Sequence, residues 1–358
     1  MNNDPSSNPG PAQTDPALSA SPQIPAGLYT VPPDSTLEPN PAVPDDFLSD
    51  VTGTDMDFFG DVPLWTPEIN RTCQKVANWI RCDYGGGFVF GLQHIGKSSC
   101  AQYIRATIPA ILGPRIAIFL WLTDDDAKKS PENCLADWIR HSGCEYYSQT
   151  RKQALKLTLY DWLSDRANAL GASRIVIIVD DAHWMDNGFY SLLLSVWNEL
   201  KGRKRRPFVL QIGQPELQRV KDTFSGTDAL QIVNRFFGVK HEYLGINPLD
   251  LRDLFAEMEK SKDGGFSKHF LPHLAPRGFS LERIAAPMVE AVNTLALSQN
   301  IRGEVRLPMG RLRSSICTLL YRLRADTSIV GVDAKLVYDC FVECELPDVL
   351  RYYVTGPA

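Results

Sequence analysis

The sequence predicts an α/β fold built on a parallel, doubly wound sheet, followed by a smaller helical domain. From Val62 onward, short apolar runs of strand length alternate with stretches whose apolar residues recur at helical spacing. Such alternation is typical of strand–helix–strand units and a parallel sheet. After Pro248 the strand-like runs stop and the pattern becomes helical.

The predicted elements follow in order along the chain. Helices are expected over 68–81, 98–108, 132–141, 150–170 and 189–200. The second of these helices should end at Pro109, because proline disrupts helical hydrogen bonding. Strands are expected over 88–90, 115–122, 175–179 and 208–212, with a weaker candidate at 240–244. The run 175–179 is β-branched throughout, which is typical of a strand buried on both faces.

Charge is distributed unevenly along the 358 residues. The first 70 residues contain eleven acidic and no basic side chains, so 37 basic and 31 acidic side chains remain in the rest, a net charge of +6. Eleven of the 25 prolines lie in the first 50 residues. This composition predicts a disordered, acidic, proline-rich tail over 1–60. The tail is either a solubilising leader or a segment that docks a partner or mimics DNA.

Composition excludes several classes of protein. No apolar run reaches the roughly 18–20 residues of a membrane span, and the start of the chain lacks the pattern of a signal peptide. The eight cysteines form no C-x-x-C pair and no spacing with histidine that suggests zinc. We therefore expect a cytoplasmic protein with reduced thiols and no membrane partner.

A glycine-rich loop matches the pattern G-x-x-x-x-G-K-S, between a predicted strand and a predicted helix. In such loops the backbone N–H groups surround phosphates; Lys97 would reach the β- and γ-phosphate oxygens and Ser98 would bind Mg²⁺. His94 and Ile95 replace the usual small residues and predict a stiffer loop. ATP and Mg²⁺ are the expected cofactors. The predicted nucleotide-binding residues here are Gly91, Leu92, Gln93, His94, Ile95, Gly96, Lys97, Ser98 and Ser99.

Two acids end the β-branched run. Asp180 is placed to bind nucleotide-associated Mg²⁺, and Asp181 to orient or deprotonate the attacking water. The second acid of such a pair is usually glutamate. Asp181 is one methylene shorter, which predicts slow hydrolysis. The alternative is that both acids cap the next helix. His183 and Trp184, which follow, receive no chemical role.

The order of these motifs resembles AAA+ ATPases over about residues 65–300. After the loop come Asp180-Asp181-Ala182-His183 and a strand that runs into Gln214-Pro215-Glu216-Leu217. The pattern is most similar to the branch that contains the TniB/TnsC-type transposition regulators and the ExeA-type secretion ATPases. The resemblance implies an AAA+ P-loop NTPase fold over 61–249 and a helical lid domain over 250–325. The C-terminal helical segment, 326–358, would dock on the lid or bind a transposase.

The resemblance also implies roles for three residues. Gln214 matches the sensor 1 position, which contacts the γ-phosphate or its water. Arg235 matches an arginine finger that completes the site of a neighbouring subunit in an ATP-driven homo-oligomer, a ring or helical filament. Arg283 lies near the sensor 2 position of the lid and would contact nucleotide. The alternatives are a turn cap for Gln214 and surface ion pairs for the two arginines.

A basic run, Lys201-Gly202-Arg203-Lys204-Arg205-Arg206, precedes the strand 208–212. Basic runs suit contacts with the phosphates of duplex DNA, although a solvated loop gives the same pattern. The predicted DNA-binding residues are Arg203, Lys204, Arg205, Arg206, Lys128 and Lys129.

The resemblance implies an ATP-dependent, DNA-binding regulator of transposition. It would oligomerise on target double-stranded DNA with ATP and recruit or activate a transposase, with target-selector proteins as further partners. One alternative is a signalling or defence NTPase that acts through protein partners. The other is an ExeA-type secretion ATPase, which normally carries a membrane span and a peptidoglycan-binding part that are not visible in this sequence.

Overall fold

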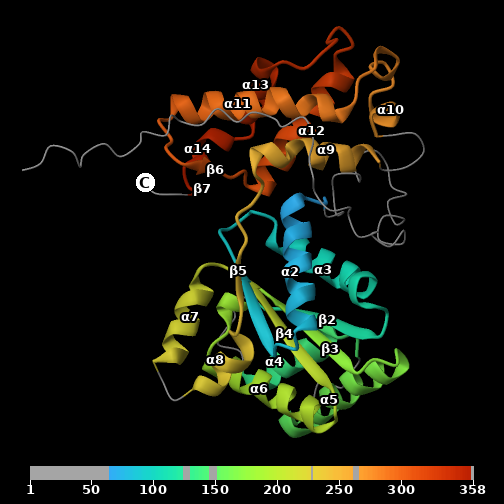
Figure 1. Cartoon of the computed structure of the whole chain (residues 1–358), viewed down its shortest axis with the longest axis vertical. Helices are drawn as coiled ribbons and strands as arrows, with labels where there is room; N and C mark the ends of the chain where they lie inside the picture. Colours follow the sequence, from blue (N-terminus) through green and yellow to red (C-terminus); the bar gives the residue numbers. More distant parts are fainter. Residues whose placement is uncertain (1–63, 124–129, 145–150, 227–228, 261–265, 356–358) are drawn as a thin grey trace, which may run out of the picture.

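The computed structural model describes residues 64–123, 130–144, 151–226, 229–260 and 266–355. The predicted acidic tail and the predicted DNA contacts Lys128 and Lys129 lie outside these ranges. Figure 1 shows two parts, an α/β part that contains the sheet and a helical part that lies above its upper end.

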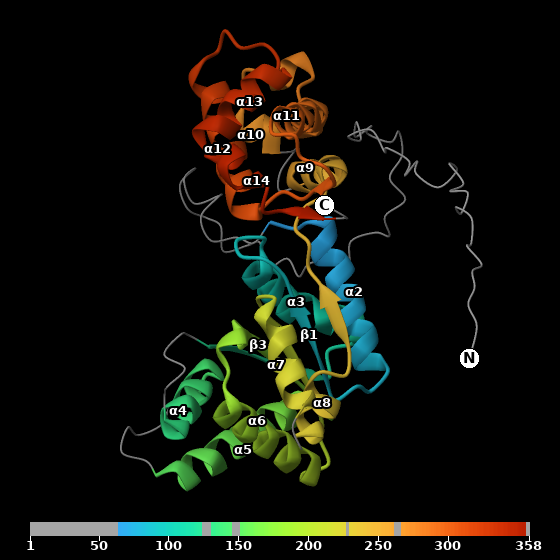
Figure 2. The ribbon, with the colours of Figure 1, turned by 90° about the vertical axis from the view of Figure 1, so that its left-hand side faces the viewer.

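Five parallel strands form the sheet in the order β2-β3-β4-β1-β5. Their bounds are β1 Gly86–Phe90, β2 Ile116–Leu122, β3 Arg174–Asp180, β4 Arg206–Gly213 and β5 Lys240–Glu242. Phe90 pairs with Gly213, so the loops that follow β1 and β4 begin side by side. The carboxyl ends of the strands face the helical part (Figure 2). The predicted parallel sheet is confirmed.

Helices cover both faces of the sheet, which explains the continuous apolar runs of its strands. On β1, Phe88 packs toward the α4, α5, α6 and α8 side, and Val89 packs toward α2 and α3. The helices of this part are α2 Pro67–Arg81, α3 Lys97–Leu112, α4 Pro131–His141, α5 Lys152–Ala169, α6 Asn187–Gly202, α7 Glu216–Ser225 and α8 Leu230–Phe236.

The predicted end of the second helix at Pro109 is wrong. Helix α3 continues through Pro109 to Leu112. Proline at 109 gives up one hydrogen bond, to the carbonyl of residue 105, but only three helical residues follow it, and the preceding Ile108 is fully buried in the core. The helix ends at Gly113, whose φ of +97° other residues rarely adopt.

The helical part has one hydrophobic core, to which α9, α11, α12, α13 and α14 all contribute. The predicted boundary at residue 325 therefore falls inside a shared core. Glu304–Val305 (β6) pairs with Val354–Thr355 (β7) in a short antiparallel ladder. The helices are α9 Leu251–Glu259, α10 Phe266–Phe270, α11 Ala285–Ser298, α12 Met309–Ala325, α13 Ala334–Glu343 and α14 Leu346–Leu350.

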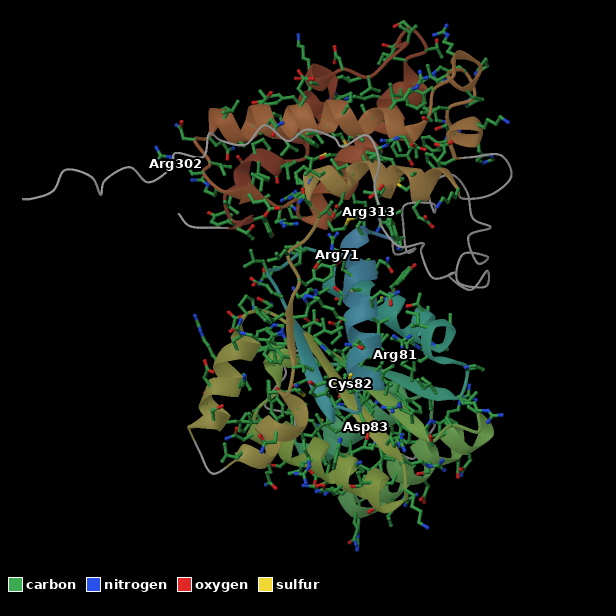
Figure 3. All side chains as sticks on the ribbon, viewed as in Figure 1. Arg71, Arg81, Cys82, Asp83, Arg302 and Arg313 are labelled. Carbon is green, nitrogen blue, oxygen red and sulfur yellow. The ribbon has the colours of Figure 1, made fainter. Side chains whose placement is uncertain are left out.

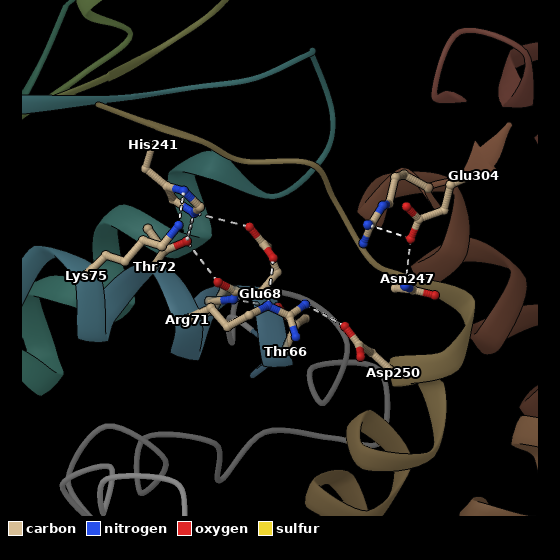
Figure 4. A network of polar contacts seen from close by, with 11 residues as sticks. Thr66, Glu68, Arg71, Thr72, Lys75, His241, Asn247, Asp250 and Glu304 are labelled. Atoms are coloured by element: carbon tan, nitrogen blue, oxygen red, sulfur yellow. Dashed lines mark hydrogen bonds and ion pairs between the residues drawn. The ribbon is translucent and has the colours of Figure 1, made fainter. Parts of the chain in front are cut away.

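A polar network joins the two parts at the upper end of α2 (Figures 3 and 4). Arg71 donates to Asp250 at 2.6 Å, and Asp250 immediately precedes α9. The same guanidinium donates to Glu68 at 3.0 Å. His241, at β5, lies 3.3 Å from Glu68 and 3.1 Å from the hydroxyl of Thr72. The first helix of the helical part is thus tied to the α/β part by hydrogen-bonded charges.

We expect Arg71→Met to lower the free energy of unfolding by about 1–3 kcal/mol, the usual cost of leaving a buried acceptor unsatisfied. The side chain of Asp250 is only 16% exposed, and burial raises its pKa even though its bonds to Arg71 oppose that change. Urea unfolding measures the loss. Asp250→Asn is the control, because it keeps an oxygen that accepts from Arg71 and removes the buried charge; it should lose less. An equal loss in both variants would show that the charge, not the unsatisfied acceptor, matters.

Candidate nucleotide site

The loop between β1 and α3 lies at the carboxyl edge of the sheet and depends on its two glycines. A Cβ at Gly91 would lie 2.2 Å from the carbonyl oxygen of Tyr243, and Gly96 has a φ of +100°. Only glycine tolerates both conditions without strain. Because α3 begins at Lys97, the unpaired N–H groups of its first turn open at the end of this loop. Such a helix start favours anions.

Lys97 is the first residue of α3, directly after the loop, and is 8% exposed. Its Nζ donates to the carbonyl oxygen of Leu92 at 2.5 Å. Burial lowers the pKa of Lys97, while the charges of Asp180, Asp181 and Glu216 oppose that change. The ammonium is therefore close to the carboxylates of Asp180 and Asp181 at the end of β3, where a polyphosphate and its metal would be held.

Asp180 ends β3 and is 3% exposed. Its carboxylate accepts a hydrogen bond from the hydroxyl of Ser98, and burial raises its pKa although that bond opposes the change. The structure therefore brings together the two residues predicted to bind Mg²⁺. A hydroxyl and a carboxylate are oxygen ligands of the kind that Mg²⁺ takes in nucleotide sites, so these residues fit the ion.

Asp181 lies next to this pair in a left-handed conformation, with φ of +53°. Aspartate tolerates this region better than most residues. Its side chain is 48% exposed, and its Oδ1 lies 3.9 Å from the Nδ1 of His183. The carboxylate thus projects from the edge of the sheet beside Asp180, where water can reach it.

Gln214 follows β4 and contacts both neighbouring segments. Its Oε1 accepts from the amide of Gln93, in the loop, at 3.0 Å. Its Nε2 lies 2.8 Å from the Nε2 of His183. No role for His183 is predicted from the sequence, where its place shortly after the acid pair is the only signal.

Helix α12 also contacts the loop. The N–H of Gly310, in α12, donates to the carbonyl oxygen of His94 at 3.1 Å. Near the end of the chain, the hydroxyl of Tyr353 donates to the carbonyl oxygen of Gln93 at 3.0 Å. Arg283, which was predicted to contact nucleotide, lies in a short 3-10 helix, Leu281–Ile284 (η5), and this helix packs against α9. Arg311, for which the sequence predicts no role, is in the first turn of α12 and pairs with Glu345 at 3.1 Å.

Arg235 lies at the opposite edge of the sheet. A Cβ at Gly85, which precedes β1, would lie 3.1 Å from the carbonyl oxygen of Arg235. The guanidinium of Arg235 lies over the ring of Trp197, on α6, 4.9 Å from the ring centroid. Arg235 is therefore not part of the nucleotide site of its own protomer.

The basic run also lies at this opposite edge, at the start of β4. Arg203 pairs with Asp161 at 2.7 Å and with Glu199 at 2.9 Å. Arg205 donates to the carbonyl oxygen of Ala172 and to the side chain of Asn168. Lys204 and Arg206 are exposed. Two of the four predicted DNA contacts in the run thus bind other parts of the same chain.

The sheet order, the glycine-rich loop after β1 and the acid pair after β3 define an AAA+ P-loop NTPase fold. Residues 82–220 match the family model described as an AAA domain. Among curated proteins, none matches the sequence. None of the helices in the described part of the chain combines the length and hydropathy of a membrane span.

A solved structure shares this fold at low identity, and a second is similar over less of its own length. The Aeropyrum pernix ORC2 protein in its ADP form is 12% identical, with a TM-score of 0.54, over 81% of this chain and 73% of that chain. Cdc6p from Pyrobaculum aerophilum is 12% identical, with a TM-score of 0.47, over 76% of this chain and 66% of that chain. At such identities the likeness concerns the fold alone.

Proposed function

We propose that the protein is a Mg²⁺-dependent ATPase whose ATP-bound form assembles on duplex DNA and regulates transposition. The observation that carries the ATPase assignment is the meeting of Lys97, the Ser98–Asp180 pair and Gln214 at one edge of the sheet. Lys97 binds the β- and γ-phosphate oxygens, and Ser98 and Asp180 would hold Mg²⁺, which neutralises phosphate charge. Asp181 orients or deprotonates the attacking water.

The DNA and transposition parts of the proposal rest on charge and on the motif order. The chain beyond residue 70 has a net charge of +6, which favours contact with phosphates. The order of motifs resembles transposition regulators, which implies that the assembly recruits or activates a transposase and receives a target from selector proteins. In such an assembly ATP lies between subunits, so binding favours assembly and hydrolysis favours release.

A second candidate function is an ATP-switched NTPase that acts through protein partners. It is favoured by the internal contacts of Arg203 and Arg205, which reduce the basic surface available to phosphates. Its ATP site would work in the same way, but its assembly would need no DNA.

Fluorescence anisotropy on a labelled duplex distinguishes the two. With Mg²⁺ and a non-hydrolysable ATP analogue, the proposed regulator should bind duplexes of unrelated sequence alike, because backbone contacts read charge and not bases. Binding should weaken with salt, with a log–log slope of about −0.9 for each phosphate neutralised. An absence of analogue-stimulated binding to any duplex at low salt would reject the transposition proposal and favour the protein-partner NTPase.

Replacing the exposed Lys204 and Arg206 with Ser should make the slope of log K against log salt concentration less negative by about 2 if both contact phosphates. Lys268 and Lys335 are exposed in the helical part, and the same double replacement there is the control. An unchanged slope in the Lys204 and Arg206 variant would place the DNA contacts elsewhere.

Asp181→Asn should trap the ATP-bound form. The wild-type protein should turn over below the roughly 1–100 s⁻¹ of kinases, because the shorter acid positions water poorly. The variant should bind ATP normally, since Lys97, Ser98 and Asp180 are intact, and should hydrolyse it much more slowly. Phosphate release gives the rate, and size-exclusion chromatography with ATP reports the assembly. Undiminished hydrolysis would show that another residue positions the water.

A further inference from the structure

His183 is buried at the nucleotide site, and the proposed reaction does not use it. Its side chain is only 5% exposed. The amide nitrogen of Gln214 lies 2.8 Å from Nε2 of its ring. The oxygen of Gln214 faces Gln93, so the amide nitrogen is the atom that faces His183. An amide nitrogen can only donate, and Nε2 of His183 therefore accepts. A neutral imidazole with an accepting Nε2 carries its proton on Nδ1.

Nδ1 is buried and has no hydrogen-bond partner in the described part of the chain. The carboxylate of Asp181 lies 3.9 Å away, slightly beyond hydrogen-bond distance. Burial lowers the pKa of His183, while Asp181 and Glu216 oppose that change and Lys97 reinforces it. A small movement of Asp181 would satisfy the buried donor.

Packing fixes the ring in this place. A Cβ at Gly213, the last residue of β4, would lie 3.1 Å from the backbone nitrogen of His183 and 3.2 Å from Nδ1. The absence of a side chain at Gly213 thus makes room for the imidazole against the end of β4. The centroid of the Trp184 ring lies 4.9 Å from that of the His183 ring.

We propose that His183 is a positioning residue for ATP hydrolysis, an inference that rests on the proposed ATPase function. By accepting from Gln214, it fixes the amide so that its oxygen faces Gln93 in the phosphate-binding loop. By offering its Nδ1–H to Asp181, it holds the carboxylate that acts on water. Gln93, Gln214 and His183 are hydrogen-bonded in sequence. Closing the 3.9 Å gap between Nδ1 and Asp181 would extend this polar chain from the loop to the water-binding acid.

Three variants test this role. His183→Phe fills the space but has no polar atom, and should lower kcat roughly 10–100-fold, as loss of a supporting hydrogen bond does in other sites. The Kd for a fluorescent ATP analogue should stay within about threefold, because His183 does not touch the phosphate ligands. His183→Gln can place an amide oxygen near the former Nε2, so it restores the acceptor for Gln214 but not the donor to Asp181, and it should recover part of kcat. His183→Asn reaches only the former Nδ1 and should not.

A double variant supplies the matched control. Gln214→Leu removes the partner of Nε2, and His183→Phe combined with Gln214→Leu should be no slower than the slower single variant, because both break the same chain. A double variant whose loss in kcat equals the product of the two single losses would overturn the proposal. So would a wild-type kcat in His183→Phe, or a kcat in His183→Gln as low as in His183→Asn.

A failure of the positioning role can be distinguished from a failure of the ATPase assignment. A wild-type protein that neither binds nor hydrolyses ATP, or hydrolysis that survives Lys97→Ala, refutes the proposed function and this role with it. Wild-type hydrolysis that requires Lys97 but is indifferent to His183 refutes only the positioning role. If His183→Phe does not fold, the comparison of His183→Gln with His183→Asn still decides.

Discussion

Lys97→Ala is expected to weaken ATP binding on the order of 30-fold to several thousand-fold, which corresponds to the roughly 2–5 kcal/mol cost of removing one partner of a buried charge pair. The loop over 91–98 contains no other lysine or arginine. Lys97 is 8% exposed and lies near the acids that follow β3, so its ammonium meets the phosphates in a desolvated place. Distant cations cannot replace it.

Titration with a fluorescent ATP analogue in Mg²⁺ measures this effect. Lys335→Ala, an exposed lysine in the helical part, is the control and should bind like the wild type. Circular dichroism should confirm that Lys97→Ala is folded. An unchanged ATP affinity in that variant would remove the phosphate-binding assignment of the loop and every function that depends on it.

The features that sequence predicts well here are local. Strand runs and helical spacing are visible within ten to twenty residues, and they gave the parallel sheet that the structure confirms. The approach of Asp180 and Gln214 to the loop depends on the sheet, since the carboxyl ends of parallel strands share one edge. Strand order then brings those ends together.

The features that sequence does not predict depend on contacts between distant segments. The basic run appears free in the sequence, yet Arg203 pairs with Asp161, 42 residues away. Tyr353 reaches the carbonyl of Gln93 across 260 residues. His183 looks like a surface residue after an acid pair, yet its ring packs against Gly213, 30 residues later, where a Cβ would lie 3.2 Å from Nδ1. No local pattern carries this information.

Arg235→Ala is expected to leave the Kd for ATP unchanged and to lower kcat by about 10³–10⁵, the range found when an arginine finger is lost. The separation of binding from turnover follows from position. Arg235 lies beside Gly85 at the amino end of β1, and the phosphate-binding loop follows the carboxyl end of the same strand. The guanidinium therefore cannot complete its own site, and it acts only if a neighbouring subunit presents a site to it. Arg115, exposed at the amino end of β2, is the control, and Arg115→Ala should turn over normally.

Mixing Arg235→Ala with Lys97→Ala tests whether the arginine acts between subunits. Each variant alone lacks one half of every composite site. In a mixed assembly, an Arg235→Ala protomer supplies a loop with Lys97, and a Lys97→Ala neighbour supplies Arg235, so some interfaces contain both groups. ATP hydrolysis should therefore reappear on mixing and reach its maximum near equal proportions. If mixtures stay inactive while Arg235→Ala alone hydrolyses ATP like the wild type, Arg235 is not the finger, and its stacking on Trp197 has a structural role within the protomer.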